Sequence, residues 1–202
     1  LSFTNMMELN HNFYILAALI SGISLLLIRM ALGKNSKHEE LLGLPFEYAS
    51  QLIMPLSLAY GVGQVAFSSD LYSMETSMAG VLGVVYYILF YIHSRKTLYA
   101  IVAQCLVFVT AIIALNWQGM DLVSIFYSIE LISVGFLALS YVLKKYASAL
   151  FVPTMNIALS SLCLWYISQI SYGLSIENNA LFAGMVALCA LLSAQFLENF
   201  KA

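Results

Sequence analysis

The feature that most constrains this chain is a series of long apolar segments separated by short polar ones. Each segment is close to the roughly 20 residues that an α-helix needs to cross the hydrocarbon of a bilayer. The segments cover residues 13–32, 47–68, 77–93, 98–117, 121–143, 147–171 and 178–198. The chain is therefore predicted to be all-α, a polytopic membrane bundle of about seven transmembrane helices.

Composition supports lipid as the main solvent of this chain. Of the 202 residues, 62% are hydrophobic and only 9% are charged, against about 45–50% and about 25% in ordinary soluble domains. The polar segments are too short to form a soluble domain, so residues 1–202 are predicted to be one transmembrane domain. Because the sequence begins with Leu1 and not with Met, we expect either a processed form or a piece of a longer protein.

The basic residues predict the orientation of the bundle. Lys and Arg resist translocation and therefore mark the cytoplasmic side of a membrane protein. If the chain has seven spans, all eight basic residues fall on one face: Arg29, Lys34, Lys37, Arg95, Lys96, Lys144, Lys145 and Lys201. This orientation places the N-terminus outside the cell and the C-terminus in the cytoplasm.

One acidic side chain lies deep inside a predicted span. Glu130 is nine residues beyond Asp121, about 13 Å along a helix that rises 1.5 Å per residue. We see no Lys or Arg in an apolar window where it could pair with Glu130, so we expect the carboxyl to be protonated. Ionisable residues in spans are candidates for proton or ion movement. The alternative is a protonated carboxyl that joins two helices by hydrogen bonds.

Other polar residues in the spans need hydrogen-bond partners inside the bundle, because a buried amide or hydroxyl without a partner costs free energy. Helical spacing places Tyr127 and Ser133 one turn from Glu130. The candidate partners from other windows are Gln104, Asn156 and Gln195. Together these six residues form the predicted intramembrane polar site.

Two prolines, Pro55 and Pro153, are predicted helix breaks, because a proline inside a helix leaves a carbonyl without its donor. In transporters such breaks often surround the substrate site, whereas in other membrane proteins they only change the shape of a helix. Small residues at helix-packing spacing, Ala79 with Gly83 and Ala180 with Gly184, predict close contacts between helices.

No motif predicts a catalytic, cofactor or metal site. The three histidines, His11, His38 and His93, lie at or beyond the predicted membrane boundaries on different faces, so no pair could ligate a haem. H-E-x-x-H, G-x-S-x-G and P-loop patterns are absent from the sequence. A net charge of −2 argues against nucleic-acid binding. We expect no enzymatic activity, no cofactor and no metal.

A weak internal repeat joins two parts of the sequence. The segments YYILFYIHSRKTLYAIV and FLALSYVLKKYASALFV align so that Arg95–Lys96 matches Lys144–Lys145. Each copy predicts a helix, a tight basic turn and a second helix, and such short turns make the two helices antiparallel neighbours.

Residues 107–152 resemble the hairpin unit of a large uncharacterised family of bacterial multi-pass membrane proteins. In that family one helix ends near a short Gly-containing turn, and the next begins with Trp, two small or apolar residues and Glu before an apolar run to a basic turn. The matching positions are Tyr127, Ser128, Ile129 and Glu130, followed by Lys144–Lys145. Tyr127 replaces the Trp, and this chain is much shorter. The resemblance implies a multi-pass protein of a bacterial inner membrane and no particular reaction.

These observations leave two main functions and a third alternative. In the first, the bundle is a non-catalytic subunit or scaffold of a bacterial envelope complex, in contact with the lipid bilayer and with helices of other membrane proteins. In the second, it transports a small solute, a lipid or protons, with Glu130 at the path. The third is a membrane sensor module. A polar cavity at Glu130 would favour transport.

Overall fold

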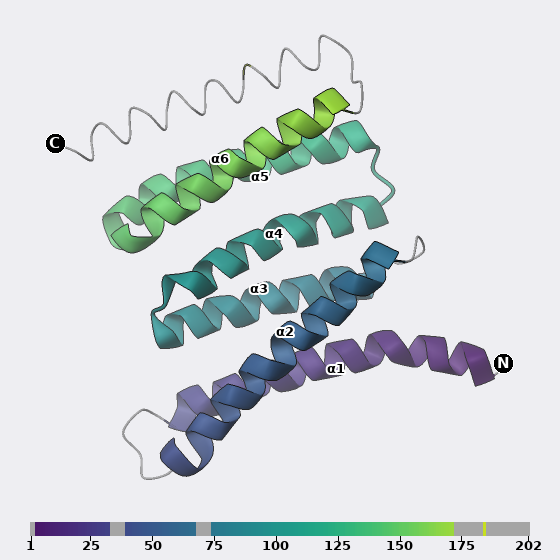
Figure 1. Cartoon of the computed structure of the whole chain (residues 1–202), viewed down its shortest axis with the longest axis vertical. Helices are drawn as coiled ribbons and strands as arrows, with labels where there is room; N and C mark the ends of the chain where they lie inside the picture. Colours follow the sequence, from purple (N-terminus) through teal and green to yellow (C-terminus); the bar gives the residue numbers. More distant parts are fainter. Residues whose placement is uncertain (1–2, 33–38, 68–73, 172–183, 185–202) are drawn as a thin grey trace. The chain divides into compact units, whose positions relative to one another are not determined.

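The computed structural model describes residues 3–32, 39–67, 74–171 and 184, and this part of the chain contains helices and no strand (Figure 1). The helices are α1 (Phe3–Leu32), α2 (Leu44–Phe67), α3 (Met74–Ser94), α4 (Thr97–Trp117), α5 (Leu122–Tyr146) and α6 (Ser148–Ser171). A short π-helical turn, Glu39–Gly43, leads into α2. The predicted all-helical class is confirmed for these residues.

A helix covers each of the first six predicted windows. The helix α1 begins ten residues before the window 13–32, and the other ends differ from the predicted ones by three residues at most. The seventh window, 178–198, lies outside the described residues apart from residue 184. Among the described residues, five segments are long and apolar enough to cross a membrane: Tyr14–Leu32, Met74–Ser94, Thr97–Trp117, Leu122–Tyr146 and Ser148–Ser168. The finding supports a multi-pass membrane protein, and α2 is not among the five.

The two prolines do not end their helices. The helix α2 continues through Pro55, and α6 continues through Pro153. Neither proline interrupts its helix, although the sequence predicted a break at each. A proline frees only one intrahelical carbonyl, and neighbouring groups in a membrane bundle can satisfy it. A third proline, Pro45, lies in the first turn of α2, where its missing N–H costs nothing.

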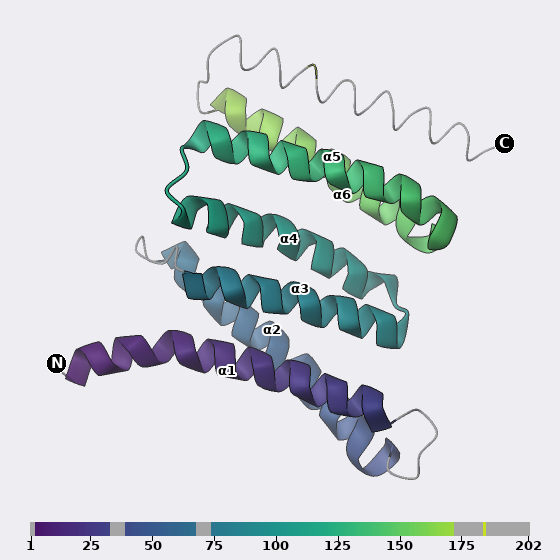
Figure 2. The ribbon, with the colours of Figure 1, turned by 180° about the vertical axis from the view of Figure 1, so that it is seen from behind.

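The contacts divide the chain into two compact units, which we call the N-terminal unit (Leu1–Gln118) and the C-terminal unit (Gly119–Ala202). The N-terminal unit contains the antiparallel hairpin of α3 and α4, with α1 and α2 packed beside it. The C-terminal unit contains the hairpin of α5 and α6 (Figures 1 and 2). These two hairpins correspond to the two copies of the predicted repeat. A single domain over residues 1–202 stays a prediction.

Close packing of α1, α2 and α3 forms the core of the N-terminal unit. Its buried apolar side chains include Leu19 and Leu26 on α1, Met54 on α2, and Tyr86 and Phe90 on α3. Lipid tails are as apolar as these side chains, so inside a membrane such contacts stabilise the unit by van der Waals packing and not by removal from water.

Small residues allow α3 to approach its neighbours. A Cβ atom on Gly83 would lie 2.9 Å from a methyl group of Leu58 on α2. A Cβ atom on Gly80 would collide with the side chain of Thr110 on α4. Ala79 is buried on the same side of α3. The predicted close contact at Ala79 and Gly83 is therefore confirmed, and it lies inside the N-terminal unit.

The substitution Gly80→Ala should destabilise the N-terminal unit, because the new methyl group overlaps Thr110. We expect a loss of about 1–3 kcal/mol in the free energy of unfolding, measured by denaturant titration in mild detergent. The double substitution Gly80→Ala with Thr110→Ala should recover part of this loss. The matched control is Gly135→Ala on α5, where a Cβ atom meets nothing within 4 Å and the better helix propensity of Ala makes the change neutral or favourable. Equal effects of the two single substitutions would contradict the predicted contact.

Candidate functional site

A charged cluster joins three helices at one end of the N-terminal unit, and we call it the charged junction. The Nε of Arg29, near the end of α1, donates to Oε2 of Glu47 on α2 at 3.2 Å. The Nε2 of His93, at the end of α3, lies 3.6 Å from the same oxygen. The side-chain amide of Gln51, one turn along α2, donates to Oε1 of Glu47 at 3.4 Å. The carboxylate of Glu47 therefore links α1, α2 and α3.

The charges of this junction are largely removed from solvent. Arg29 is only 3% exposed, and the side chain of Glu47 is 21% exposed. Gly43 lies against the guanidinium, and a Cβ atom there would be 3.1 Å from Cδ of Arg29. A buried charge is tolerated when it is paired and hydrogen-bonded. Arg29 was predicted to lie on the cytoplasmic face, which stays a prediction; the structure shows it as a buried partner of Glu47 near the end of α1.

Hydroxyl groups extend the charged junction along α2 and α3. The Oγ of Ser50 donates to the carbonyl of Glu47 at 2.8 Å and lies 3.2 Å from the hydroxyl of Tyr86. Because Ser50 uses its only hydrogen on the carbonyl, Tyr86 is the donor in the second bond.

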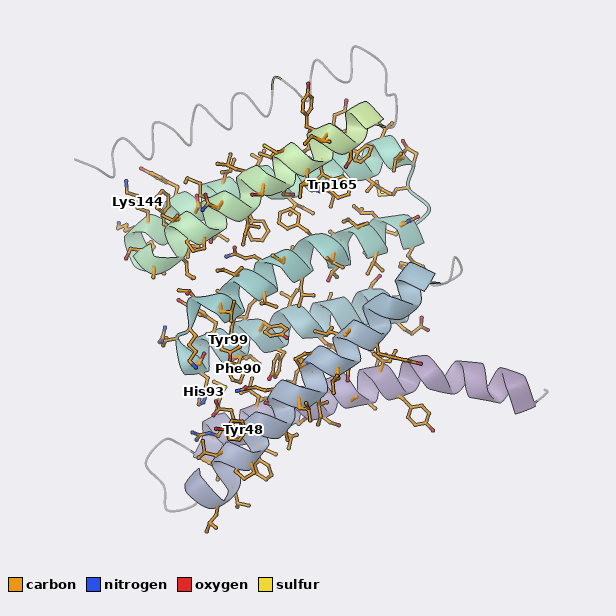
Figure 3. The ribbon with its side chains drawn as sticks, viewed as in Figure 1. Tyr48, Phe90, His93, Tyr99, Lys144 and Trp165 are labelled. Atoms are coloured by element: carbon orange, nitrogen blue, oxygen red, sulfur yellow. The ribbon has the colours of Figure 1, made fainter. Side chains whose placement is uncertain are left out.

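The rings of Phe90 and Tyr99 pack edge to face, with centroids 4.3 Å apart. Figure 3 labels Phe90, His93 and Tyr99 at this end of the unit.

A second group of buried polar side chains lies on the two helices of the C-terminal unit. The buried members are Glu130, Ser133 and Ser140 on α5 and Thr154 and Ser161 on α6, and we call this group the polar seam. The hydroxyl oxygens of Ser133 and Ser161 lie 3.0 Å apart, within hydrogen-bond distance, and Oγ of Ser133 is also 2.9 Å from the carbonyl oxygen of Ile129. The spacing of Thr154 and Ser161, seven residues or two helical turns, keeps both on the face of α6 that meets α5.

Larger side chains enclose the polar seam near its two ends. The rings of Phe126 on α5 and Trp165 on α6 meet edge to face, with centroids 5.3 Å apart. Toward the other end, Nζ of Lys144 lies 5.8 Å from the centroid of the Phe151 ring. Lys144 and Trp165 mark these opposite ends of the hairpin in Figure 3. Aromatic contacts therefore flank the hydroxyl contact of Ser133 with Ser161 along the α5–α6 hairpin.

Two of the predicted site residues belong to this seam. Glu130 is 0% exposed, and Ser133 contacts Ser161. Ser161 was not predicted, although it lies on a stripe of α6 that its spacing from Thr154 could have indicated. Tyr127, which was also predicted, is only partly buried on α5.

The structure describes two of the three predicted partners from other windows. Asn156 is exposed on α6, and Gln104 is buried on α4 in the other unit. Gln195 lies outside the described residues. Their pairing with Glu130 stays a prediction.

Asp121 caps the start of α5 outside the span. Its carboxylate accepts a hydrogen bond from the hydroxyl of Ser124 at 2.6 Å and from the backbone N–H of Ser124 at 3.3 Å. These hydrogen bonds favour the ionised form and lower the pKa of Asp121 below its ordinary value. A charged N-cap of this kind also interacts favourably with the positive end of the helix dipole.

The chemistry available at both sites is hydrogen bonding and ion pairing. Within the ranges that the structure describes, no three His, Cys, Asp or Glu side chains gather as metal ligands. Comparison with family models, with curated proteins and with solved structures finds no match for this chain. The geometry of its own residues is therefore the basis for any functional proposal.

Breaking the pair of Arg29 and Glu47 should weaken the N-terminal unit strongly. Glu47→Leu removes the carboxylate from the buried guanidinium of Arg29 and should cost about 3–5 kcal/mol in the free energy of unfolding. Arg29→Met should cost less, because the Glu47 that it leaves is partly exposed and is still contacted by His93. The double substitution should cost clearly less than the sum of the two. The control Lys96→Met removes an exposed charge and should change stability by less than about 0.5 kcal/mol. Additive single and double effects would exclude the proposed coupling.

The cap at Asp121 predicts a pH dependence of α5. Because the folded state binds the Asp121 proton more weakly than the unfolded chain, the cap stabilises the hairpin above about pH 4. This stabilisation is lost as the pH falls through the lowered pKa. Thermal unfolding should therefore show a smaller acid dependence in Asp121→Asn, which keeps a capping oxygen without the charge. An unchanged acid dependence in this variant would contradict the assignment.

Proposed function

We propose that this chain is a non-catalytic integral membrane subunit or scaffold of a bacterial envelope complex. The observation that carries the proposal is the way in which the buried polar side chains contact one another. Arg29 and Glu47 join α1 to α2, and Ser133 and Ser161 join α5 to α6. Side chains engaged in this way stabilise a rigid set of helices, which is what a scaffold requires.

The outer surface of α2 supports a role in assembly. Its exposed large side chains, Tyr48, Leu52, Leu56 and Tyr60, recur every four residues, so they form one continuous stripe along the helix. In a membrane such a stripe contacts lipid or the helix of another protein. Association between helices in lipid depends on van der Waals packing, for which a regular apolar stripe is suited.

The proposed setting is a bacterial inner membrane, crossed seven times, with the N-terminus outside and the C-terminus in the cytoplasm. The tight turns of the two hairpins support this orientation, because Arg95–Lys96 and Lys144–Lys145 lie at or beside them. Alternate connections of a multi-pass protein lie on the same side of the membrane, and basic residues mark the cytoplasmic side. The resemblance of residues 107–152 to a bacterial family supports the location.

The proposal predicts a stable partner for the intact protein. A tagged chain, solubilised gently from its native membrane, should retain the same partner at a constant ratio through affinity and size-exclusion steps. The variant Glu130→Gln should retain this partner at the same ratio, because a neutral amide of similar shape can replace the carboxyl in a packed contact. Leu52→Ala with Leu56→Ala should reduce retention, because it removes the middle of the α2 stripe.

Two results would contradict the subunit proposal. One is a chain that elutes without a partner under every gentle condition. The other is solute or proton movement in vesicles that contain the purified chain, abolished by Glu130→Gln. The second result would establish the transport alternative. A matched vesicle control, Leu131→Ala on the exposed side of α5, separates this effect from general loss of the fold.

A further inference from the structure

One face of α3 carries a regular apolar stripe that leads to a basic turn. Its exposed large side chains are spaced three or four residues apart: Met78, Val81, Val85, Ile88 and Ile92. Residues at this spacing share one face of a helix, so the five side chains form a continuous surface, which we call the α3 stripe. Each of them is 42–53% exposed. The stripe ends three residues before Arg95.

Two cations follow the α3 stripe. Arg95 and Lys96 connect α3 to α4, and both are exposed. Among the described residues, neither of them takes part in an ion pair. The only acid on α3 or α4 is Glu75, which precedes Arg95 by twenty residues, or about 30 Å along the helix. The turn therefore carries positive charge that no described acid neutralises.

The backbone at Arg95 supports a use for its side chain. Its φ of 57° lies in the left-handed region that glycine adopts most easily. The backbone N–H of Arg95 donates to the carbonyl of Tyr91 at 2.7 Å, and at the end of a helix this kind of hydrogen bond usually comes from a glycine. An arginine here costs free energy that a glycine would avoid, and strained positions of this kind are common at functional sites. The guanidinium is therefore a candidate for contact with a ligand.

The basic turn of the C-terminal unit lacks this combination and serves as a comparison. The Nζ atoms of Lys144 and Lys145 lie 5.8 Å and 5.4 Å from the centroids of aromatic rings of their own unit. The exposed positions of α5 before this turn include the small residues Gly135 and Ala138, which offer little apolar surface. Two adjacent cations occur in both turns, but a regular stripe of large apolar side chains leads only to the first.

An amphiphile with a negative headgroup matches the α3 stripe and its turn in both shape and charge. An acyl chain can pack on apolar side chains by van der Waals contact, and basic residues at the membrane surface attract anionic lipid headgroups. The hydrocarbon of one leaflet is about 15 Å thick, half of a bilayer core of roughly 30 Å. The stripe from Val85 to Ile92 extends for about 10 Å, so it lies within the reach of one acyl chain.

We propose that the α3 stripe and the turn after it form a binding site for one anionic phospholipid. An acyl chain lies along Ile88 and Ile92, and the phosphate lies between Arg95 and Lys96. This site is separate from the stripe on α2 and needs no partner protein, so it goes beyond the subunit proposal.

Native mass spectrometry of the intact, delipidated protein in mild detergent tests the site, because it resolves single lipid-binding events. Phosphatidylglycerol and phosphatidylcholine with the same acyl chains are titrated separately. The first phosphatidylglycerol should bind about tenfold more tightly than the first phosphatidylcholine, since two cations contact its headgroup. This preference should fall as ammonium acetate is added, because salt screens exposed charges.

Paired substitutions locate the site on the protein. Arg95→Gln with Lys96→Gln should remove most of the preference for phosphatidylglycerol. Lys144→Gln with Lys145→Gln removes the same charge from the other turn and should keep the preference. Inorganic phosphate and glycerophosphoglycerol, which is the headgroup without its acyl chains, should not displace the lipid at constant ionic strength.

Three results would overturn the lipid site. Equal binding of the two lipids by the wild-type protein would leave the α3 stripe to the helix of another protein. Equal losses in the two double variants would show only a general attraction between cations and anionic lipid. Displacement by inorganic phosphate or glycerophosphoglycerol would show that the turn binds the free anion. If a variant does not fold, the wild-type titrations and the displacement experiment still decide the question. None of these results affects the co-purification experiment.

Discussion

The structure depends on one constraint, the inability of hydrocarbon to form hydrogen bonds. A polar group inside a membrane must find its partner within the protein. The backbone satisfies this requirement by forming helices, and the buried side chains satisfy it by pairing between helices. The contact of Arg29 with Glu47 in the N-terminal unit and that of Ser133 with Ser161 in the C-terminal unit are two solutions to the same problem.

The two units pair their buried polar side chains with different chemistry. In the N-terminal unit a full ion pair is buried at the end of the helices, where Glu47 retains some exposure and His93 approaches it from α3. In the C-terminal unit the contact lies nearer the middle of the helices and joins the hydroxyls of Ser133 and Ser161. The charged pair therefore lies near the helix ends, and the hydroxyl pair lies inside the span. This order follows the free energy of placing a charge at each depth.

The helices could be predicted from the sequence more completely than the contacts between them. The length and periodicity of apolar windows are local properties, so the boundaries of α2 to α6 were predicted within three residues. The extension of α1 to Phe3 was missed because its first residues are polar. The pairing of Arg29 with Glu47 depends on how a helix folds back across a connection, and nothing local indicates it. Ser161 was missed because it is one of several serines in α6, and serine is an ordinary residue in an apolar helix.

We propose that the polar side chains of the spans close helix contacts and do not line a path for water. Ser133 tests it most directly, because it lies at the contact of α5 with α6 and is fully buried. In a chain whose own cysteines are replaced, Ser133→Cys should stay unlabelled by charged thiol reagents added to either side of intact vesicles, whereas Met120→Cys, which is exposed, should be labelled. Rapid labelling of the cysteine at position 133 from one aqueous side would contradict the claim.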